Sequence, residues 1–203
     1  MVNTYMVYKR GGNEAIVVDP AWHPKRLVEE AEARGLKIKL VLATHGHFDH
    51  ILGAEYVCKA TGAHFAMSRK DETILPLNPI ISRGIPGGPF NPQPKIDYDL
   101  SKPTRIRVGR IELLTTPTPG HTPGSITVYD PQQRFAFTGD TLFKDSVGRT
   151  DLPGGSLSEL RKSLKKLVRI LKPETIIYPG HGPRTTLEEE LRNNPFMRGL
   201  RTT

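Results

Sequence analysis

LVLATHGHFDHILGA runs from Leu40 to Ala54 and places three histidines and an aspartate within six residues, directly after an apolar run typical of a buried strand. The imidazole and carboxylate groups of His45, His47, Asp49 and His50 are ligands that divalent metal ions bind. His45 and His47 are two positions apart, so an extended loop sends their side chains to the same side. Asp49 and His50 lie at the turn into the next helix. The stretch therefore predicts a metal site, provided that other loops supply further ligands.

Three more polar residues follow apolar strands: His121 in PTPGHTPGS, Asp140 in TGDTLF and His181 in PGHGP. Groups that follow strands ending at one edge of a sheet gather at that edge. A tight backbone turn is easiest at glycine. A glycine directly precedes each of the three, at Gly120, Gly139 and Gly180. Together with the histidine loop, these positions predict one metal centre built from four loops.

Composition bounds the class of protein. The chain has 203 residues, of which 36% are hydrophobic, and this favours a single domain over 1–203. No apolar run approaches the roughly 18 residues that cross a bilayer, and the N-terminus lacks the layout of a signal peptide. Cys58 is the only cysteine, so no internal disulfide can form, as is usual in a reducing cytoplasm. We expect a cytoplasmic protein that spans no membrane, with Cys58 as an inert thiol.

The net charge of +8 raises the question of nucleic-acid binding. Much of this charge lies in SLSELRKSLKKLVRILK, residues 156–172, where apolar residues recur at helical spacing opposite a basic stripe. No aromatic residue interleaves this stripe for base stacking. An amphipathic surface helix with a solvated basic face is the simpler interpretation. We therefore expect no nucleic-acid partner, and the charge would favour small anionic substrates.

Strands and helices alternate along the chain. We predict strands at 3–8, 14–19, 37–43, 63–68, 104–108, 110–116, 124–130, 134–140 and 175–179, and helices at 24–35, 50–62 and 156–172, with a last helix opened by Thr185 and Glu188. This order favours an α/β fold with two sheets and helices outside them. The region from about Pro76 to Pro103 is rich in proline and glycine and too long for a plain connector. We predict that it forms a flap.

The motif THGHFDH, followed in order by His121, Asp140 and His181, resembles the THxHxDH pattern of the metallo-β-lactamase superfamily. Within that superfamily the chain is most similar to the short glyoxalase II-like (hydroxyacylglutathione hydrolase-like) hydrolases. The resemblance covers nearly the whole chain, through NTYMV, DP at Asp19, GHTPGS, GDTLF, SVGRTDLPGGS, PGHGPRTTLEEE and NNPFM. It implies a four-layer αββα sandwich with the metals at the edge where the strands end.

The same resemblance implies two divalent metal ions, with zinc expected first and iron or manganese as alternatives. The family pattern assigns His45, His47 and His121 to one metal, Asp49, His50 and His181 to the other, and Asp140 to a bridge between them. Asp19 resembles the family's aspartate that steadies the histidine loop without binding metal. His23 and His64 match no family ligand, and we expect structural or exposed roles for both.

Three residues have further candidate roles. Asp49, besides binding metal, could hold or accept a proton during catalysis, and Asp140 is catalytic through its bridge. Arg149, in GRTDLPGG, could bind a substrate carboxylate through two parallel hydrogen bonds, or it could pair with Asp151 as part of the scaffold. The residues alone leave these two roles for Arg149 equally open.

The function implied by the resemblance is hydrolysis of a glutathione-type thioester such as S-lactoylglutathione. A hydroxide shared by the two metals would attack the carbonyl carbon, so no protein nucleophile is required, and the partner is a small anionic thioester. One alternative is a persulfide dioxygenase with a single iron, which resembles the chain in GRTD and in the histidine loop. The other is a nuclease of the superfamily, although 203 residues leave little room for a nucleic-acid clamp. GHGPRTT and the NPF ending favour the hydrolase.

One departure concerns the N-terminus. The family usually has a further strand before the segment that matches NTYMV, and this chain begins almost there. Either the edge strand is absent or the start of the sequence is mis-assigned. A sheet edge without that strand would leave backbone groups unpaired, and proteins normally cover or pair such edges. We therefore expect that a homodimer could form along this edge.

Overall fold

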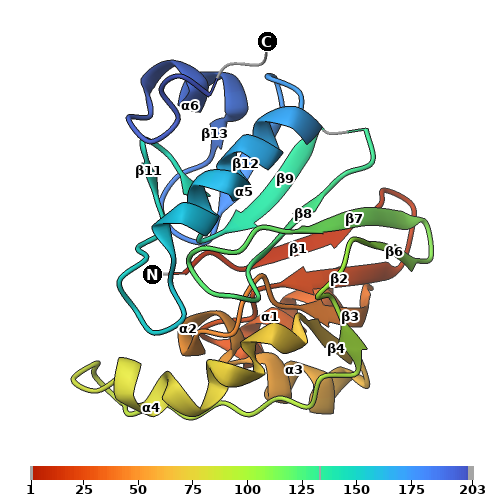
Figure 1. Cartoon of the computed structure of the whole chain (residues 1–203). Coiled ribbons are helices and arrows are strands. Elements are labelled where there is room, and N and C mark those ends of the chain that lie inside the picture. Colours follow the sequence, from red (N-terminus) through yellow and green to blue (C-terminus); the bar gives the residue numbers. More distant parts are fainter. Residues whose placement is uncertain (1, 133, 201–203) are drawn as a thin grey trace.

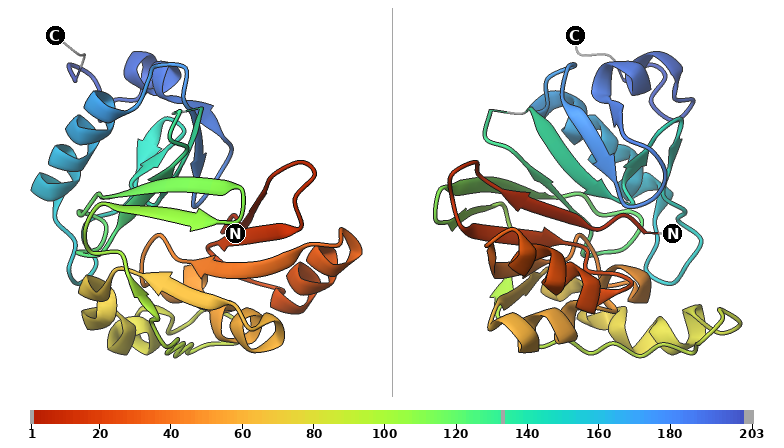
Figure 2. Two further views of the ribbon diagram at one scale, coloured as in Figure 1. Left: turned by 90° about the vertical axis from the view of Figure 1, so that its right-hand side faces the viewer. Right: turned by 180° about the vertical axis from the view of Figure 1, so that it is seen from behind.

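Two mixed β-sheets lie face to face and helices cover their outer faces, as Figure 1 shows. The computed structural model describes residues 2–132 and 134–200. One sheet has the strand order β1-β2-β3-β4-β5 and the other β13-β12-β9-β8-β7-β6. Seen from the side and from behind, the layers run helix, sheet, sheet, helix (Figure 2). The predicted four-layer αββα sandwich is confirmed.

The first sheet is built from the N-terminal half of the chain. Its strands are β1 (Tyr5–Tyr8), β2 (Glu14–Val18), β3 (Lys37–Leu42), β4 (His64–Met67) and β5 (Tyr98–Asp99). Helices α1 (Pro24–Ala33) and α3 (Ala54–Thr61) cover its outer face. Both faces are covered at the centre of this sheet, so β2 from Ala15 onward and the last three residues of β3 are continuous buried apolar runs.

The second sheet follows. Its strands are β6 (Thr104–Val108), β7 (Ile111–Pro117), β8 (Ile126–Tyr129), β9 (Phe135–Gly139), β12 (Ile176–Pro179) and β13 (Thr185–Thr186). A small hairpin of β10 (Leu142–Phe143) and β11 (Ser146–Val147) follows β9. Helix α5 (Leu157–Ile170) packs on the outer face, and α6 (Leu187–Asn193) ends the described helices. The strands predicted at 104–140 are confirmed.

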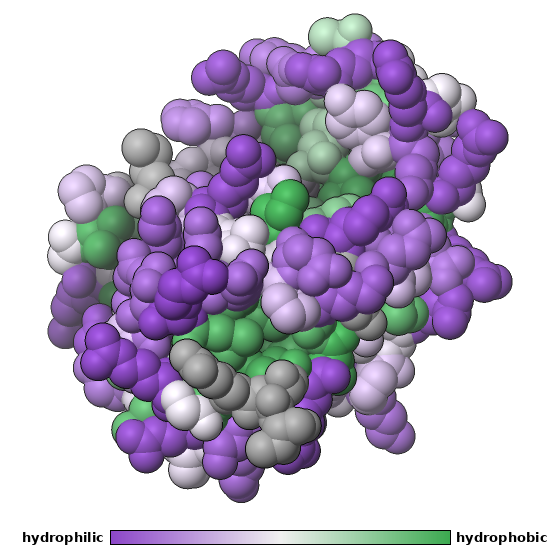
Figure 3. All heavy atoms as spheres, turned by 90° about the horizontal axis from the view of Figure 1, so that it is seen from above, coloured by the Kyte–Doolittle hydropathy of each residue, from purple (hydrophilic) through white to green (hydrophobic). Residues whose placement is uncertain are grey.

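Three apolar layers hold this arrangement together. Residues such as Ile16, Leu42 and Leu113 are buried between the two sheets, and a second cluster joins the first sheet to α1 and α3. In α5 the leucines at the predicted spacing, Leu160 and Leu164 among them, are buried. Seen from above, hydrophilic residues dominate the surface and hydrophobic ones show between them (Figure 3). No described helix is long and apolar enough to cross a membrane.

Two local predictions need correction. The helix expected over 50–62 is two helices, α2 (Phe48–Ile51) and α3, because Gly53 N donates to the Pro20 carbonyl oxygen at 2.8 Å and not to a carbonyl one turn back in the helix. A Cβ at Gly53 would not fit this close approach, since it would lie 2.8 Å from the carbonyl oxygens of Pro20 and Ala21. The last helix is capped by Thr186 with Glu189, not by Thr185 with Glu188. Thr185 pairs with Ile177 in the sheet instead, so its backbone is committed to a strand.

The proline-rich region has more structure than its composition suggests. It is preceded by 3₁₀ turns at Arg69–Thr73 (η1) and Leu75–Leu77 (η2), and it contains helix α4 (Asn78–Ile81) and strand β5. In Figure 1 the part with α4 extends beyond the lower edge of the sandwich. Ile80 is 67% exposed and Ile85 41%. Its role as a flap stays a prediction.

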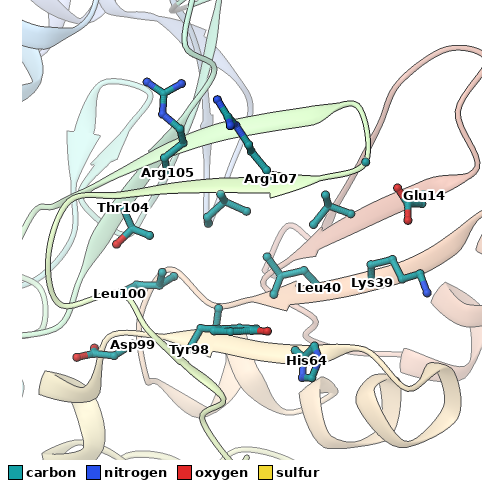
Figure 4. Close-up of a pocket in the computed structure, with 14 residues that line it drawn as sticks. Glu14, Lys39, Leu40, His64, Tyr98, Asp99, Leu100, Thr104, Arg105 and Arg107 are labelled. Carbon is teal, nitrogen blue, oxygen red and sulfur yellow. The ribbon is translucent and has the colours of Figure 1, made fainter.

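A cavity of about 630 Å³ opens between β6 and strands β3, β4 and β5. Figure 4 shows Leu40 and Leu100 inside it, whereas the side chains of Arg105 and Arg107, which also border it, point away from these leucines. Both arginines lie within ion-pair distance of Glu112. Of the residues predicted to bind metal, none lines this cavity, so it is the open side of the sandwich and not the metal centre.

Cys58 is expected to react slowly with alkylating reagents. It lies half-buried in α3, and burial raises the pKa of its thiol to about 11. Since only the thiolate reacts, alkylation by iodoacetamide at pH 8 should be about 100-fold slower in the folded protein than in urea. Mass spectrometry of the time course measures both rates, and equal rates would contradict a buried thiol.

Candidate metal centre

The predicted ligands follow strands that end at one edge of the sandwich. The loop after β3 carries His45 and His47, and α2 starts directly behind it. The other positions follow parallel-running strands: His121 comes after β7, Asp140 directly after β9, and His181 after β12. The carboxyl ends of these strands meet, which is why residues far apart in sequence share one site.

The structure brings all seven predicted residues together in overlapping groups. Potential ligand atoms lie within 4.8 Å of one another in three sets: His45, His47 and His121; His45, His50 and Asp140; and Asp49, His50 and His181. The first and third sets coincide with the two groups of ligands that the family pattern assigned. Asp140 belongs to the second set, which shares His45 with the first set and His50 with the third.

Asp140 lies at the middle of this arrangement. Its Oδ1 is 3.3 Å from His50 Nε2, and its Oδ2 is 3.6 Å from His121 Nε2 and 3.4 Å from His181 Nε2. The two ring nitrogens His47 Nδ1 and His121 Nε2 are 2.9 Å apart. One carboxylate that reaches histidines of both groups has the geometry of a bridge.

Unpartnered polar atoms test whether this site suits a cation. Among the described residues, four buried side-chain atoms make no hydrogen bond of good geometry: Nε2 of His45, His47 and His50, and Oδ1 of Asp140. Two of them, His50 Nε2 and Asp140 Oδ1, are 3.3 Å apart and interact only as an ion pair. Buried polar atoms are nearly always paired, and all four of these belong to one cluster of nitrogen and oxygen donors. The donor set fits zinc, iron or manganese.

The second ring nitrogens of three histidines have partners outside the cluster. His50 Nδ1 lies 2.9 Å from Asp19 Oδ2, and His121 Nδ1 lies 2.8 Å from the backbone carbonyl oxygen of Arg149. His45 Nδ1 lies 3.2 Å from Thr44 Oγ1. A ring nitrogen that donates to such a partner fixes the tautomer and leaves the other nitrogen free for a metal.

Asp19 holds the loop as well as the ring. Its carboxylate accepts hydrogen bonds from Thr44 N at 2.7 Å and Thr44 Oγ1 at 2.8 Å, and the residue is 1% exposed. It adopts φ +51°, a backbone conformation that aspartate tolerates better than most residues. The geometry agrees with the supporting role that the sequence predicts for Asp19.

Charge and burial set the protonation of the cluster. Burial, helped by the neighbouring imidazoles, lowers the pKa of His45 well below its ordinary value and that of His47 to about 3, so both rings are neutral, the form that binds metal. Burial also acts to lower the pKa of His50, but the carboxylates of Asp140 and Asp19 outweigh it and raise that pKa. A cation would replace the proton that His50 holds.

The two carboxyl groups of the site stay ionised. Burial acts to raise the pKa of Asp49, but a hydrogen bond from His181 and the nearby imidazoles outweigh it and lower the pKa to about 2. Burial likewise opposes ionisation of Asp140, and the charge on His50 outweighs it, so its pKa is lowered. Both are therefore carboxylates at neutral pH and available to a metal ion.

A glycine leaves room for the cluster. A Cβ on Gly180 would lie 2.3 Å from Asp140 Oδ1 and 2.6 Å from His50 Cε1. No larger residue fits at that position without moving a predicted ligand. The glycine next to His181 therefore provides space as well as a turn.

The site opens to solvent on one side. His45, His50 and His121 are buried, whereas the side chains of His181 and Asp49 are 34% and 24% exposed. A substrate approaching the cluster would meet His181 and Asp49 first.

Arg149 pairs with Asp151 in the structure. Its Nε and Nη2 donate to the two carboxylate oxygens at 2.7 and 2.6 Å, with both side chains largely exposed. Of the two roles left open by the sequence, this geometry is that of the scaffold pair. The Arg149 carbonyl, which holds His121, was not predicted.

Two further buried side chains support the histidine loop and were also not predicted. Asp71 accepts a hydrogen bond from Gly46 N, and Asn78 bonds backbone groups of Gly46 and Phe48. Neither belongs to a metal-ligand pattern, so no signal in a single sequence identifies them. His64 lies outside the cluster, 3.6 Å from Asp97 and with a side chain 60% exposed, and His23 precedes α1.

Comparisons with known proteins agree with this geometry. A family model described as metallo-beta-lactamase superfamily matches residues 1–181. Hydroxyacylglutathione hydrolase GloC of Haemophilus influenzae is 32% identical, and the match covers 90% of this chain and 87% of that protein. The mitochondrial persulfide dioxygenase ETHE1 of Mus musculus is also 32% identical, with 96% of this chain and 70% of that protein covered.

Two solved structures are similar to this chain over nearly its whole length. The B3 metallo-beta-lactamase BLEG-1 superposes with a TM-score of 0.89 at 32% identity, covering 98% of this chain and 95% of that one. TTHA1623 in a di-iron-bound form superposes with a TM-score of 0.83 at 33% identity, covering 96% of this chain and 94% of that one. The αββα sandwich, the cluster of histidines and aspartates at its edge, and a family match over most of its length place this chain in the metallo-β-lactamase superfamily.

Proposed function

We propose that the protein is a binuclear metal-dependent hydrolase of a glutathione-type thioester such as S-lactoylglutathione. The observation that carries this proposal is the presence of two complete sets of candidate ligands, with the Asp140 carboxylate between them. His45, His47 and His121 would hold one ion, Asp49, His50 and His181 the other, and Asp140 both. The 32% identity to a hydroxyacylglutathione hydrolase supports the choice of substrate.

When bound, the metal ions would supply an ionised water at neutral pH and a Lewis acid for the substrate carbonyl. The chain provides the remaining functions. Asp19, Thr44 and the Arg149 carbonyl orient the histidine rings. Asp49, an ionised carboxylate 3.5 Å from His181 on the open side, is the candidate to hold the proton of the attacking water by accepting a hydrogen bond from it. Hydrolysis then yields a carboxylic acid and a thiol, and no protein nucleophile is needed.

Two elements near the open side are candidates for substrate contact. The ring of Phe143, in the β10–β11 hairpin, lies edge-on to His181 with 6.0 Å between centroids. The proline-rich region from Pro76 to Pro103 would act as a flap. Arg149 could bind a substrate carboxylate only by releasing Asp151.

A persulfide dioxygenase with one iron is the second candidate, because the mouse dioxygenase is as similar in sequence as the hydrolase. Oxygen activation requires a metal with free positions. The second set of ligands, Asp49, His50 and His181, favours hydrolysis, since a single iron has no use for it.

Two assays separate these functions. We expect the metal-loaded protein to hydrolyse S-lactoylglutathione in the absence of oxygen. The loss of the thioester absorbance measures this reaction. With glutathione persulfide in an oxygen electrode we expect no oxygen uptake. Stoichiometric oxygen consumption with persulfide, and no turnover of the thioester, would contradict the hydrolase and support the dioxygenase.

A further inference from the structure

The carboxamide of Asn78 holds the backbone on both sides of His47. Its Oδ1 accepts a hydrogen bond from Phe48 N at 2.9 Å, and its Nδ2 donates to the Gly46 carbonyl oxygen at 3.0 Å. These two groups belong to the peptide units that precede and follow His47. Asn78 is fully buried, so water cannot replace either bond. One side chain therefore fixes the orientation of a predicted ligand.

Asn78 is in turn tied to the rest of the proline-rich region. The backbone carbonyl oxygen of Asn78 accepts a hydrogen bond from Ser82 Oγ at 2.7 Å. Ser82 Oγ in turn accepts a hydrogen bond from Phe90 N at 2.8 Å. The Phe90 ring stacks on Phe48, with 5.4 Å between centroids and 7° between planes. Trp22 meets the same ring edge-on. The contacts form a closed circuit from the histidine loop through Asn78, Ser82 and Phe90 back to Phe48.

Asp71 supports the loop independently of that circuit. It is fully buried and accepts hydrogen bonds from Gly46 N at 2.8 Å, Thr122 Oγ1 at 2.7 Å and Gly124 N at 2.5 Å. It thereby connects the histidine loop to the loop of His121. Because Asp71 fixes the fold of both loops, the effect of the Asn78 circuit can be tested with the loops still in place.

We propose that Asn78 is a positioning residue that couples the segment 78–90 to the metal centre. Through the circuit, the orientation of His47 and the placement of 78–90 depend on each other, so metal binding and the ordering of this segment are thermodynamically linked. A substrate that binds 78–90 more tightly in its ordered placement then raises metal affinity, and metal raises the affinity for that substrate by the same factor. The inference rests on the metal-binding part of the proposed function and does not depend on the thioester.

The first test is Asn78→Ala, with Asn91→Ala as the matched control. Asn91 is an exposed asparagine in the same region, and its side chain bonds only Gln93 among the described residues. We expect Asn78→Ala to weaken Zn²⁺ binding about 10-fold to 100-fold in a chelator competition, the range typical of residues that orient ligands. Asn91→Ala should bind Zn²⁺ as the wild type does. Equal affinity in the two variants would overturn the inference.

The second test uses the wild type, and so does not depend on whether the variant folds. Hydrogen exchange is followed with and without Zn²⁺. Metal should slow hydrogen exchange in 46–50 and also in 78–90. The exchange rates in β6, at the far edge of its sheet, should stay the same. Protection confined to 46–50 would overturn the coupling. No Zn²⁺ binding by the wild type would instead contradict the proposed function, so the two failures are distinguishable.

Discussion

Asp140→Ala is expected to remove most of the bound metal and to lower thioester hydrolysis by more than about 100-fold. Residues that only orient a ligand already contribute 10-fold to 100-fold, and Asp140 is predicted to bind both ions. Its carboxylate lies within 3.6 Å of His50, His121 and His181, so its removal takes a ligand from both groups of histidines. Metal analysis of the purified proteins measures the loss, with close to two equivalents expected in the wild type.

Two other histidines provide controls for this variant. His64 is exposed and lies near Asp97, and His23 precedes α1, so His64→Ala and His23→Ala should keep both the metal content and the activity of the wild type. Equal damage from either control would show that the metal centre lies elsewhere. If metal analysis found one iron per wild-type chain, the result would support the dioxygenase and not the hydrolase.

The layers of the fold could be predicted from the sequence because the period of the apolar residues is strong. In α5 the leucines recur at helical spacing, and the strands at the centre of each sheet are apolar runs bounded by turn residues. Boundaries were less accurate. The division of α2 from α3 depends on the approach of Gly53 to the carbonyl groups of Pro20 and Ala21, a tertiary contact that leaves no local pattern.

The candidate ligands were predictable for a different reason. Histidine and aspartate crowd a short loop and recur after strands, so both the residue types and their positions indicate metal. Their supports carry no such signal. Asp71 and Asn78 are single polar residues around a proline-rich region, and only the fold shows that they face the backbone of Gly46. The Arg149 carbonyl that bonds His121 is a backbone group, which any residue type could supply.

Asp19 carries the second large effect that we expect. Asp19→Ala removes the acceptor for Thr44 N and Thr44 Oγ1 and the partner of His50 Nδ1, all of them buried. Each unsatisfied buried group costs about 1 to 3 kcal/mol, so with three such groups the free energy of unfolding of the metal-free protein should fall by at least about 3 kcal/mol. Because His50 loses its fixed orientation, Zn²⁺ affinity should fall about 10-fold to 100-fold as well.

Two companion variants separate the loss of metal binding from the loss of stability. Asp19→Asn keeps an oxygen that can accept from Thr44 N, so it should recover part of the stability, but an amide NH₂ facing the Nδ1–H of His50 cannot accept its proton, and Zn²⁺ affinity should stay low. Asp130, also buried, pairs with Arg134 at the far end of β8. Asp130→Ala should therefore destabilise the fold, as urea unfolding measures, without weakening Zn²⁺ binding. If Asp130→Ala weakened Zn²⁺ binding as much as Asp19→Ala, the effect of Asp19 would be a general loss of stability, and its contact with His50 would have no separate role in holding the metal.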